Sequence, residues 1–423
     1  MKIYKFGGAS NATASSMHNT SEIIKNASAG KLVVVVSAVG KVTNALEKIV
    51  ESFYHNNQEE ALLLFQEMKT FHYNYIDEVL TVQQDAAKEK LKEFFTEIEW
   101  LLYDKPVRPY DYYYDQIVCC GEMFSTVILY HLLLEKETSV NWLDVRDLIR
   151  TDNNFRDAFI DWKTSEDLIQ PALSNALSNY DVVITQGFVG STDENESTTL
   201  GREGSDFTAA IFANILNAES VTIWKDVQGV MSGDPRSHKN AVLMPSLSYK
   251  EVIEMAYYGA QVIHPKTIKP LQNKQIPLLV KSFLNTSLPG TLISGVQVKG
   301  LPPVVIYQKN QCLIRFISKD FSFAEGEPIN KLFDILNDLK IKPALTQNAA
   351  ISLLCCFTYR EPKIQELAAK ASEIFDVQVQ KDLALLTIRH YDAETIEDYL
   401  AGRTVLLTQK TNENIQVLML DEN

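Results

Sequence analysis

The stretch that decides the fold is TTLGREGSDFTAAIFANILNAESVTIWKDV, residues 198–227. It starts with a glycine-rich loop, continues with apolar residues at spacings of three and four over 204–218, and ends with branched apolar residues at 220–227. The spacing predicts a helix and the final run predicts a buried strand. Strands and helices that alternate in this way are typical of a parallel sheet covered by helices.

Further runs of the same kind extend this pattern along the first part of the chain. Residues 31–38, 181–188 and 276–282 predict buried strands, and residues 247–260 predict another helix. Residues 57–103 instead have the apolar spacing of two amphipathic helices. We therefore expect an α/β fold, with a mainly parallel sheet sandwiched by helices and a helical insertion at about 57–104.

The length of 423 residues exceeds what one hydrophobic core usually supports, so at least two domains are expected. VKGLPP at 298–303 has the glycine and prolines of a linker. The segments that follow it, among them the strand patterns at 312–318, 376–380 and 384–390, predict two small α+β units, the second abbreviated. The expected division is a first domain at 1–295, a linker at 296–303 and a paired unit at 304–423.

The composition excludes several classes of protein. A net charge of -14, from 40 basic and 54 acidic residues, argues against binding to nucleic acid or to an anionic membrane. The first residues have no apolar run of a signal peptide, and no stretch approaches 18 apolar residues. Five cysteines without a zinc-like cluster predict reduced thiols, a cytoplasmic protein and no metal site of the protein's own.

Two glycine-containing loops carry the residues most suited to anions. In KFGGAS (5–10), Gly7 and Gly8 let the backbone approach a ligand closely, and Lys5 adds a positive charge for phosphate. A structural turn after a strand is the plain alternative. In GREGSD (201–206), Arg202 can hold a carboxylate through two parallel hydrogen bonds beside a helix N-terminus. There the plain alternative is a helix start capped by Ser205 or Asp206.

Other polar residues have equally open interpretations when taken singly. Glu122 could bind an ammonium group or could simply be an acidic first-turn residue. Asp226 and Arg236 could surround a nucleotide or form turns. His264 precedes a proline without a nearby metal partner, so a structural role is expected for it.

Taken together, the motifs resemble those of the aspartokinases, within the amino acid kinase superfamily, over essentially the whole chain. The motifs that carry the resemblance, in the order of that family, are KFGGAS, VVSAVGKVTN, GEMFST, WLDVRDLIRT, VITQGFVGS, TTLGREGSDFTAA, DVQGVMSGDPR and GAQVIHP.

The resemblance implies transfer of a phosphoryl group from Mg-ATP to the side-chain carboxylate of L-aspartate, which gives 4-phospho-L-aspartate for lysine, threonine and methionine synthesis. A carboxylate is already ionised at neutral pH, so this reaction needs no general base. The enzyme must mainly align two anions and neutralise charge as the transfer proceeds.

The resemblance also implies roles for individual residues. It makes Lys5 and Asp206 catalytic, with Lys5 against the transferring group and Asp206 organising that lysine. It places the substrate aspartate against Ser37, Thr43, Glu122, Arg202 and Ser205. It places ATP against Lys5, Phe6, Gly7, Gly8, Lys225, Asp226, Arg236 and Gln261. Mg²⁺ is expected to bind mainly through the nucleotide.

Three positions depart from the family pattern. Gln261 stands where the family usually has a phosphate-contacting lysine, and Lys225 stands where it usually has a small hydroxyl residue. We hypothesise that Lys225 supplies the missing charge; the alternative is that it points to solvent. Ala9 replaces the usual threonine, from which we expect reduced nucleotide affinity.

The C-terminal part resembles the paired ACT regulatory domains of this family, which implies an amino-acid effector and a homodimer. SKDFSFAEGEP (318–328) and TQNAA (346–350) differ from the corresponding segments of lysine-sensitive members. This argues against inhibition by lysine and leaves loss of feedback control open. Because no homoserine dehydrogenase portion follows, a monofunctional kinase is expected.

Two other functions stay open from the sequence. The chain could phosphorylate glutamate or N-acetylglutamate, although the Glu122 and Arg202 motifs and the ACT-like units favour aspartate. It could also be a catalytically impaired homologue that senses an amino acid, which the departures at Ala9 and Gln261 would suit. Turnover with ATP and aspartate distinguishes the two classes.

Overall fold

The structure is a computed structural model that describes residues 1–238, 240–319 and 326–421. The chain forms two compact units. The first contains residues 1–230, 243–256 and 261–298, and the second contains residues 231–242, 257–260 and 299–423. Two short segments from within the expected first domain, 231–242 and 257–260, thus pack with the C-terminal part of the chain.

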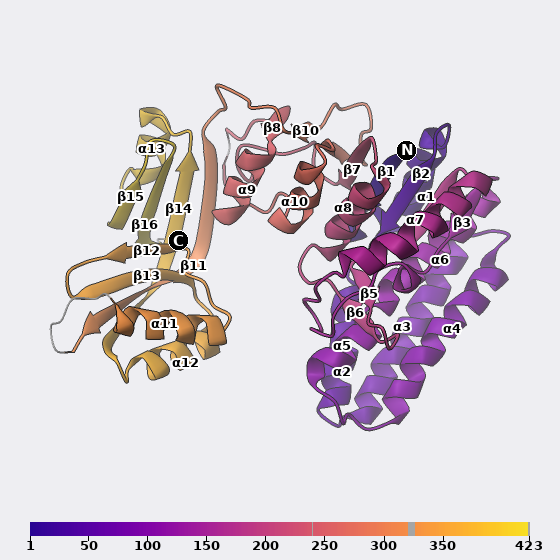
Figure 1. The fold of residues 1–423 in the computed structure, drawn as a ribbon, viewed down its shortest axis with the longest axis horizontal. Coiled ribbons are helices and arrows are strands. Elements are labelled where there is room, and N and C mark those ends of the chain that lie inside the picture. Colours follow the sequence, from indigo (N-terminus) through magenta and orange to yellow (C-terminus); the bar gives the residue numbers. More distant parts are fainter. Residues whose placement is uncertain (239, 320–325, 422–423) are drawn as a thin grey trace. The chain divides into compact units, whose positions relative to one another are not determined.

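The first unit is built on an eight-stranded sheet in the order β3-β4-β2-β1-β7-β9-β10-β8 (Figure 1). Adjacent strands are parallel except β9 and β10. The central strands β2 and β4 are buried along their whole length, as their branched apolar runs predict. The strands are β1 (Lys2–Phe6), β2 (Leu32–Val36), β3 (Val140–Trp142), β4 (Val182–Gln186), β7 (Ser220–Lys225), β8 (Ser246–Ser248), β9 (Leu278–Ser282) and β10 (Thr291–Ser294).

Helices cover this sheet, and a small hairpin of β5 (Val189–Ser191) and β6 (Ser197–Thr199) lies outside it. α8 packs on β1, β2 and β7, and α6 packs on β2, β3 and β4. The predicted fold class is therefore confirmed. The helices are α1 (Ala14–Ala27), α2 (Val42–Tyr54), α3 (Gln58–Val79), α4 (Gln84–Tyr103), α5 (Tyr110–Val118), α6 (Cys120–Glu135), α7 (Trp162–Asn179), α8 (Gly204–Leu216), α9 (Tyr249–Tyr257) and α10 (Pro265–Asn273), with short 3-10 turns at Gly8–Asn11 and Val145–Asp147.

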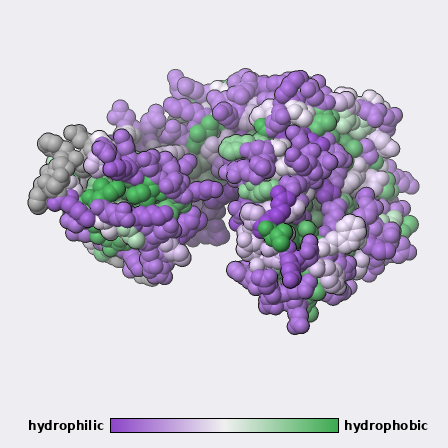
Figure 2. Space-filling view, turned by 60° about the horizontal axis from the view of Figure 1, so that its bottom comes forward, coloured by the Kyte–Doolittle hydropathy of each residue, from purple (hydrophilic) through white to green (hydrophobic). Residues whose placement is uncertain are grey.

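The two helices predicted within 57–103 are present as α3 and α4, which pack on each other and on α6. In the described part of the chain, one helical stretch, Tyr110–Glu135, is long and apolar enough to cross a membrane. We expected no stretch to approach 18 apolar residues, and this helical stretch differs from that expectation. However, 89% of its most apolar window is buried inside the protein. The face of the molecule in Figure 2 is mainly hydrophilic, as expected for a water-exposed surface.

The second unit contains a six-stranded antiparallel sheet in the order β12-β13-β11-β14-β16-β15. Its helices bury apolar side chains against two clusters of sheet residues. The strands are β11 (Val304–Ser318), β12 (Leu345–Asn348), β13 (Ser352–Thr358), β14 (Phe375–Arg389), β15 (Val405–Lys410) and β16 (Asn414–Leu420), and the helices are α11 (Glu327–Asp338), α12 (Glu361–Ala371) and α13 (Ala393–Leu400).

Two strands of this sheet, β11 and β14, are longer than the strands that the sequence pattern predicts. The predicted strand at 312–318 begins earlier, at Val304, and the two strands predicted near 376–380 and 384–390 form the single strand β14. β11 and β14 pair along their length through an irregularity between Gln308 and Leu313. This polar, bulged stretch interrupts the apolar alternation, which is why the pattern reads as shorter strands. Both small α+β units therefore share one sheet.

Candidate active site

A cavity of about 580 Å³ lies in the first unit, at the carboxyl ends of the parallel strands. Lys5 and Gly7 come from the end of β1, Ser37 follows β2, and Lys225 ends β7. The N-terminus of α8 completes the wall. Ligands of open α/β sheets bind at this edge, because the loops and helix N-termini gather there.

A buried ion pair stands in the cavity. Lys5 Nζ lies 2.7 Å from Asp206 Oδ1, and the two side chains are only 11% and 4% exposed. Burial raises the pKa of Asp206, but the charges of Lys5 and then Lys225 outweigh it and hold that pKa below its usual value. Asp206 is therefore ionised at neutral pH, and it fixes the ammonium of Lys5 at the surface of the cavity.

Glycine is required beside this pair. A side chain at Gly8 would bring its Cβ within 2.8 Å of the Gly40 carbonyl oxygen and 3.0 Å of the Ala38 carbonyl oxygen. The Gly40 amide donates to the Gly8 carbonyl oxygen (3.1 Å), so the loops after β1 and β2 are in direct backbone contact. The two loops can approach each other this closely only because Gly8 has no side chain.

Glu122 and Ser205 form the opposite wall. Ser205 Oγ donates to Glu122 Oε1 (2.8 Å), so Ser205 is not a cap; Glu203 occupies the N-cap position of α8. The interpretation of Ser205 or Asp206 as the cap is wrong, because both side chains turn into the cavity instead. Glu122 Oε2 is buried and accepts no hydrogen bond of ordinary geometry from the described residues. Burial raises the pKa of Glu122 to about 8, although Ser205 and Lys5 oppose the rise.

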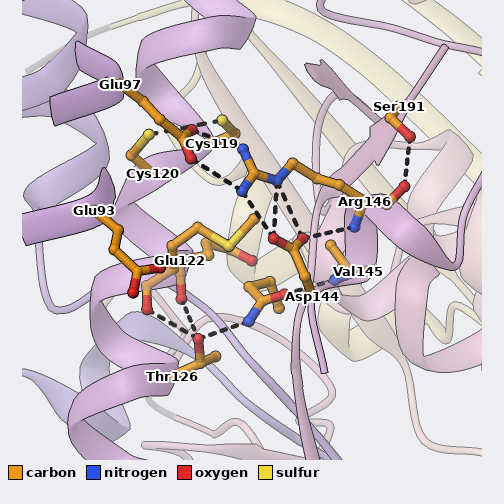
Figure 3. Close-up of polar contacts among 12 residues, drawn as sticks. Glu93, Glu97, Cys119, Cys120, Glu122, Thr126, Asp144, Val145, Arg146 and Ser191 are labelled. Carbon is orange, nitrogen blue, oxygen red and sulfur yellow. Dashed lines mark hydrogen bonds and ion pairs between the residues drawn. The ribbon is translucent and has the colours of Figure 1, made fainter. Parts of the chain in front are cut away.

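A polar network supports the helix of Glu122 from behind (Figure 3). Thr126 Oγ1 donates to the Glu122 carbonyl oxygen (2.9 Å) and accepts from Gln186 Nε2 (2.8 Å). The guanidinium of Arg146 joins Asp144 and Glu97 at 2.8 Å each. These bonds connect α4, α6 and β4 with the loop after β3, so Glu122 lies on a rigidly held helix.

The remaining residues expected to contact the amino acid also line the cavity. Ser37 and Thr43 lie on the loop after β2 and on α2. Arg202 is exposed and forms no ion pair with the residues that the structure describes. An unpaired guanidinium is available for a ligand carboxylate. The cavity thus brings together Ser37, Thr43, Glu122, Arg202 and Ser205.

Only some of the residues expected to contact the nucleotide line the cavity. Lys225 and Asp226 line the cavity, but Phe6 and Gln261 do not. Phe6 is fully buried and stacks on Trp224, at 6.0 Å between ring centroids. Arg236 belongs to the second unit, where its exposed guanidinium contacts Asp234 (2.9 Å).

Lys225 does not point to solvent. Its Nζ donates to the Val262 carbonyl oxygen at 2.7 Å, one residue beyond the exposed Gln261. Its charge also lowers the pKa of Asp206. The ammonium therefore lies beside the segment in which the family pattern has a lysine, as the compensation hypothesis requires.

Several cavity residues were missed from the sequence. Arg156 and Phe188 line the cavity with left-handed φ values of 69° and 64°, which cost about 1–3 kcal/mol each. Buried Asp115 accepts from the Arg156 and Thr199 amides at 3.0 and 2.7 Å. Burial raises the pKa of Asp115 to about 6. No short motif marks these residues, because their roles arise from contacts distant in sequence.

The chain belongs to the amino acid kinase family, whose model matches residues 1–282. It is 28% identical over 396 residues to lysine-sensitive aspartokinase 3 of Escherichia coli, covering 91% of this chain and 86% of that protein. It is 32% identical over 302 residues to bifunctional aspartokinase/homoserine dehydrogenase 1 of Zea mays, covering 69% of this chain. The chain spans about a third of the length of the bifunctional relatives it matches, 32% in the case of that maize protein.

Solved structures agree with this assignment. The structure of E. coli aspartokinase III in complex with aspartate and ADP matches with a TM-score of 0.84 and 26% identity, over 100% of this chain and 96% of that one. The same enzyme in complex with lysine and aspartate matches with a TM-score of 0.80. Aspartate kinase of Clostridium acetobutylicum, at 20% identity, has a TM-score of 0.76 and supports the fold alone.

Proposed function

We propose that this chain is an aspartate kinase, which transfers the γ-phosphoryl group of ATP to the side-chain carboxylate of L-aspartate. The observation that carries the proposal is the arrangement of three ionisable sites in one cavity. These are the buried carboxyl group of Glu122, the unpaired guanidinium of Arg202 and the Lys5–Asp206 pair. They fit, in turn, an ammonium, an α-carboxylate and a phosphoryl group.

The acceptor is held by its amino-acid end. Glu122 Oε2 has no hydrogen-bond partner of ordinary geometry among the described residues, which leaves it to accept from the substrate ammonium, and Ser205 keeps the other oxygen in place. Arg202 binds the α-carboxylate through two N–H groups. With both ends held, the side-chain carboxylate faces the ion pair, already ionised and ready to attack phosphorus.

Lys5 acts on the developing charge. As the bond from phosphorus to the ADP oxygen breaks, negative charge spreads over the equatorial phosphoryl oxygens and the leaving oxygen. The ammonium of Lys5, held by Asp206, is oriented before the reaction starts and stabilises that charge without reorganisation. Backbone N–H groups around Gly7 and Gly8 add donors to the same region.

The residues present also fit a nucleotide-bound Mg²⁺. Asp206 and Asp226 place carboxylate oxygens at the cavity, and Mg²⁺ commonly takes one or two carboxylates with phosphates and water. No cluster of three or more metal-ligating side chains occurs among the described residues. When bound, the ion would neutralise phosphate charge, and Asp226, which is exposed, is the protein carboxylate free to approach it.

The test of this function is ADP release by the purified full chain with ATP, Mg²⁺ and one acceptor at a time. We expect turnover with L-aspartate at least 100-fold above that with L-glutamate or N-acetyl-L-glutamate, because holding the amino-acid end of the acceptor fixes how far its side-chain carboxylate reaches, and acetylation removes the ammonium that Glu122 would bind. Preference for glutamate or N-acetylglutamate would make the chain a different amino acid kinase. Binding of aspartate and ADP without turnover would favour the sensor.

We infer that the second unit is a pair of ACT-like regulatory domains that forms a homodimer in the cytoplasm. All five cysteines are buried free thiols, which suits a reducing compartment. The edge strand β15 exposes Val405 and Leu406, at 41% and 37%. Part of the 318–328 segment, residues 320–325, lies outside the described residues. Light scattering and turnover with added lysine, threonine and methionine test these inferences, and we expect no inhibition by lysine.

A further inference from the structure

Glu203 occupies an unusual backbone position in the wall of the cavity. It lies between Arg202 and the first residue of α8, with φ 55° and ψ 28°, in the left-handed region. Glycine adopts this conformation without cost, whereas glutamate does so only where its surroundings require it. Its side chain provides a reason for the choice of residue.

The side chain of Glu203 holds a segment distant in sequence. Its Oε2 accepts a hydrogen bond from the His264 amide at 2.8 Å. Two residues earlier, the Val262 carbonyl oxygen accepts from Lys225 Nζ at 2.7 Å. Glu203 and Lys225 both line the cavity, so two side chains of opposite charge fix the 262–264 backbone behind its wall. We call this set of contacts the 262–264 brace.

The brace decides where the ammonium of Lys225 can lie. A lysine side chain at the end of a strand has four rotatable bonds and moves into water unless an acceptor holds it. Here the acceptor is the Val262 carbonyl, and its position depends on the neighbouring bond from His264 to Glu203. Gln261, directly before this segment, is exposed and has no charge to replace that of Lys225.

We propose that Glu203 is a positioning residue for the nucleotide. By holding the 262–264 backbone, it keeps the ammonium of Lys225 at the cavity, where the phosphates of a nucleoside di- or triphosphate bind. In this role Glu203 acts on the nucleotide through the 262–264 backbone and Lys225. The inference rests on the proposed kinase function, because it assigns a nucleotide to that end of the cavity.

The test compares ADP binding by calorimetry, with Mg²⁺ present, for the full-length wild type, Glu203→Gly and Glu203→Gln. Glycine tolerates the left-handed backbone but removes the brace, and glutamine keeps an acceptor without the charge. We expect Glu203→Gly to weaken ADP binding about tenfold, since one charge-assisted hydrogen bond is lost, with an aspartate KM within twofold of the wild type. Glu203→Gln should restore most of the ADP affinity.

Glu137→Gly is the matched control. Glu137 has a φ of 56°, is exposed and lies outside the cavity, so this change makes the same backbone substitution away from the brace. Its ADP affinity should equal that of the wild type. Equal or tighter ADP binding by Glu203→Gly would overturn the proposal, because the glutamate would then act only as a repulsive charge. An equal loss for ADP and aspartate would also overturn it, because α8 would then have loosened as a whole.

The outcomes separate this inference from the proposed function. Wild-type protein that binds ADP but never turns over aspartate would contradict the kinase, while the ADP series would still decide the role of Glu203. Wild-type protein that fails to bind ADP would overturn both.

Discussion

The cavity has an acceptor end, where we propose that aspartate binds, and a nucleotide end, where we propose that ATP binds. The two ends are built differently. At the acceptor end, Glu122 and Ser205 are buried on helices packed against the central sheet and contact each other at 2.8 Å. At the nucleotide end, Lys225 and Glu203 reach the backbone of an irregular segment, and Asp226 is exposed. Buried secondary structure therefore fixes one end, while single contacts between side chains and loop backbone fix the other.

This difference predicts how the two ends respond to change. Removal of a charge at the acceptor end leaves a charged group of the bound amino acid without its partner, and such a loss is larger than that of a contact which water can replace. Removal of a contact at the nucleotide end loosens a loop, and water can form some of the hydrogen bonds that are lost.

Arg202→Ala should have the largest effect of these variants on binding. We expect an increase in the aspartate KM on the order of 100-fold with an ATP KM within threefold, because a bidentate guanidinium–carboxylate contact is lost. Initial rates at varied aspartate and ATP measure both constants. Arg108→Ala is the control, since Arg108 is an exposed arginine of the same unit that pairs with Glu196 and does not line the cavity. Equal effects of the two changes would contradict the contrast.

Glu122 should make aspartate binding depend on pH. Because its pKa is about 8 in the free protein, the substrate ammonium must displace a proton near neutral pH, and the aspartate KM should fall by up to about tenfold per pH unit as pH rises from 6 to 8. In Glu122→Gln the aspartate KM should be high and independent of pH over this range. A flat profile for the wild type would contradict the assignment.

The raised pKa of Glu122 also predicts how the stability of the protein depends on pH. The pKa of its carboxyl group in the folded protein lies above the usual glutamate value of 4.5, so its contribution to stability is complete below about pH 4.5 and is lost as pH rises through about 8. The melting temperature of Glu122→Gln minus that of the wild type should therefore be larger at pH 9, where the buried wild-type carboxyl group is ionised, than at pH 6. Thermal melts of both proteins at the two pH values measure this difference.

Lys225→Ala should raise the ATP KM about tenfold and leave the aspartate KM within twofold, because one charge near the phosphates is removed. Gln261→Ala, which changes an exposed neutral side chain, should shift either constant by less than twofold. Unchanged kcat and unchanged ATP KM in Lys225→Ala would sink the compensation hypothesis.

Ala9→Thr should have the smallest effect. Ala9 lines the cavity beside Gly8, so a hydroxyl there adds one donor near the phosphates and should lower the ATP KM about two- to threefold. A higher ATP KM would show that the site has no space for the larger side chain.

The residues expected to contact aspartate all line the cavity, whereas those expected to contact the nucleotide do so only in part. Glu122, Arg202 and Ser205 belong to compact motifs whose local structure carries them into the cavity. Gln261 belongs to a motif of the same family, yet it does not line the cavity. Its position depends on loop packing, which no periodicity encodes.

The fold shows the same limit. Runs such as 31–38 and 181–188 are buried on both faces and predict β2 and β4 directly. The long strand β11 was shortened in the prediction because Gln308–Gln311 is polar and bulged. Asp115, which holds Arg156 and Thr199, has no sequence signal, because its partners lie 41 and 84 residues away.

The central claim is that the cavity makes an acyl phosphate on aspartate and that Lys5 stabilises the transfer. The most direct measurement is hydroxylamine trapping of the product from ATP and L-aspartate by the wild type and by Lys5→Ala, with ADP binding measured in parallel. We predict aspartate-dependent hydroxamate from the wild type and a loss of at least about 1000-fold in the variant, since removal of one electrostatic stabiliser costs about this much. Absence of hydroxamate from wild-type protein that binds ADP, or equal hydroxamate from both proteins, would contradict the account.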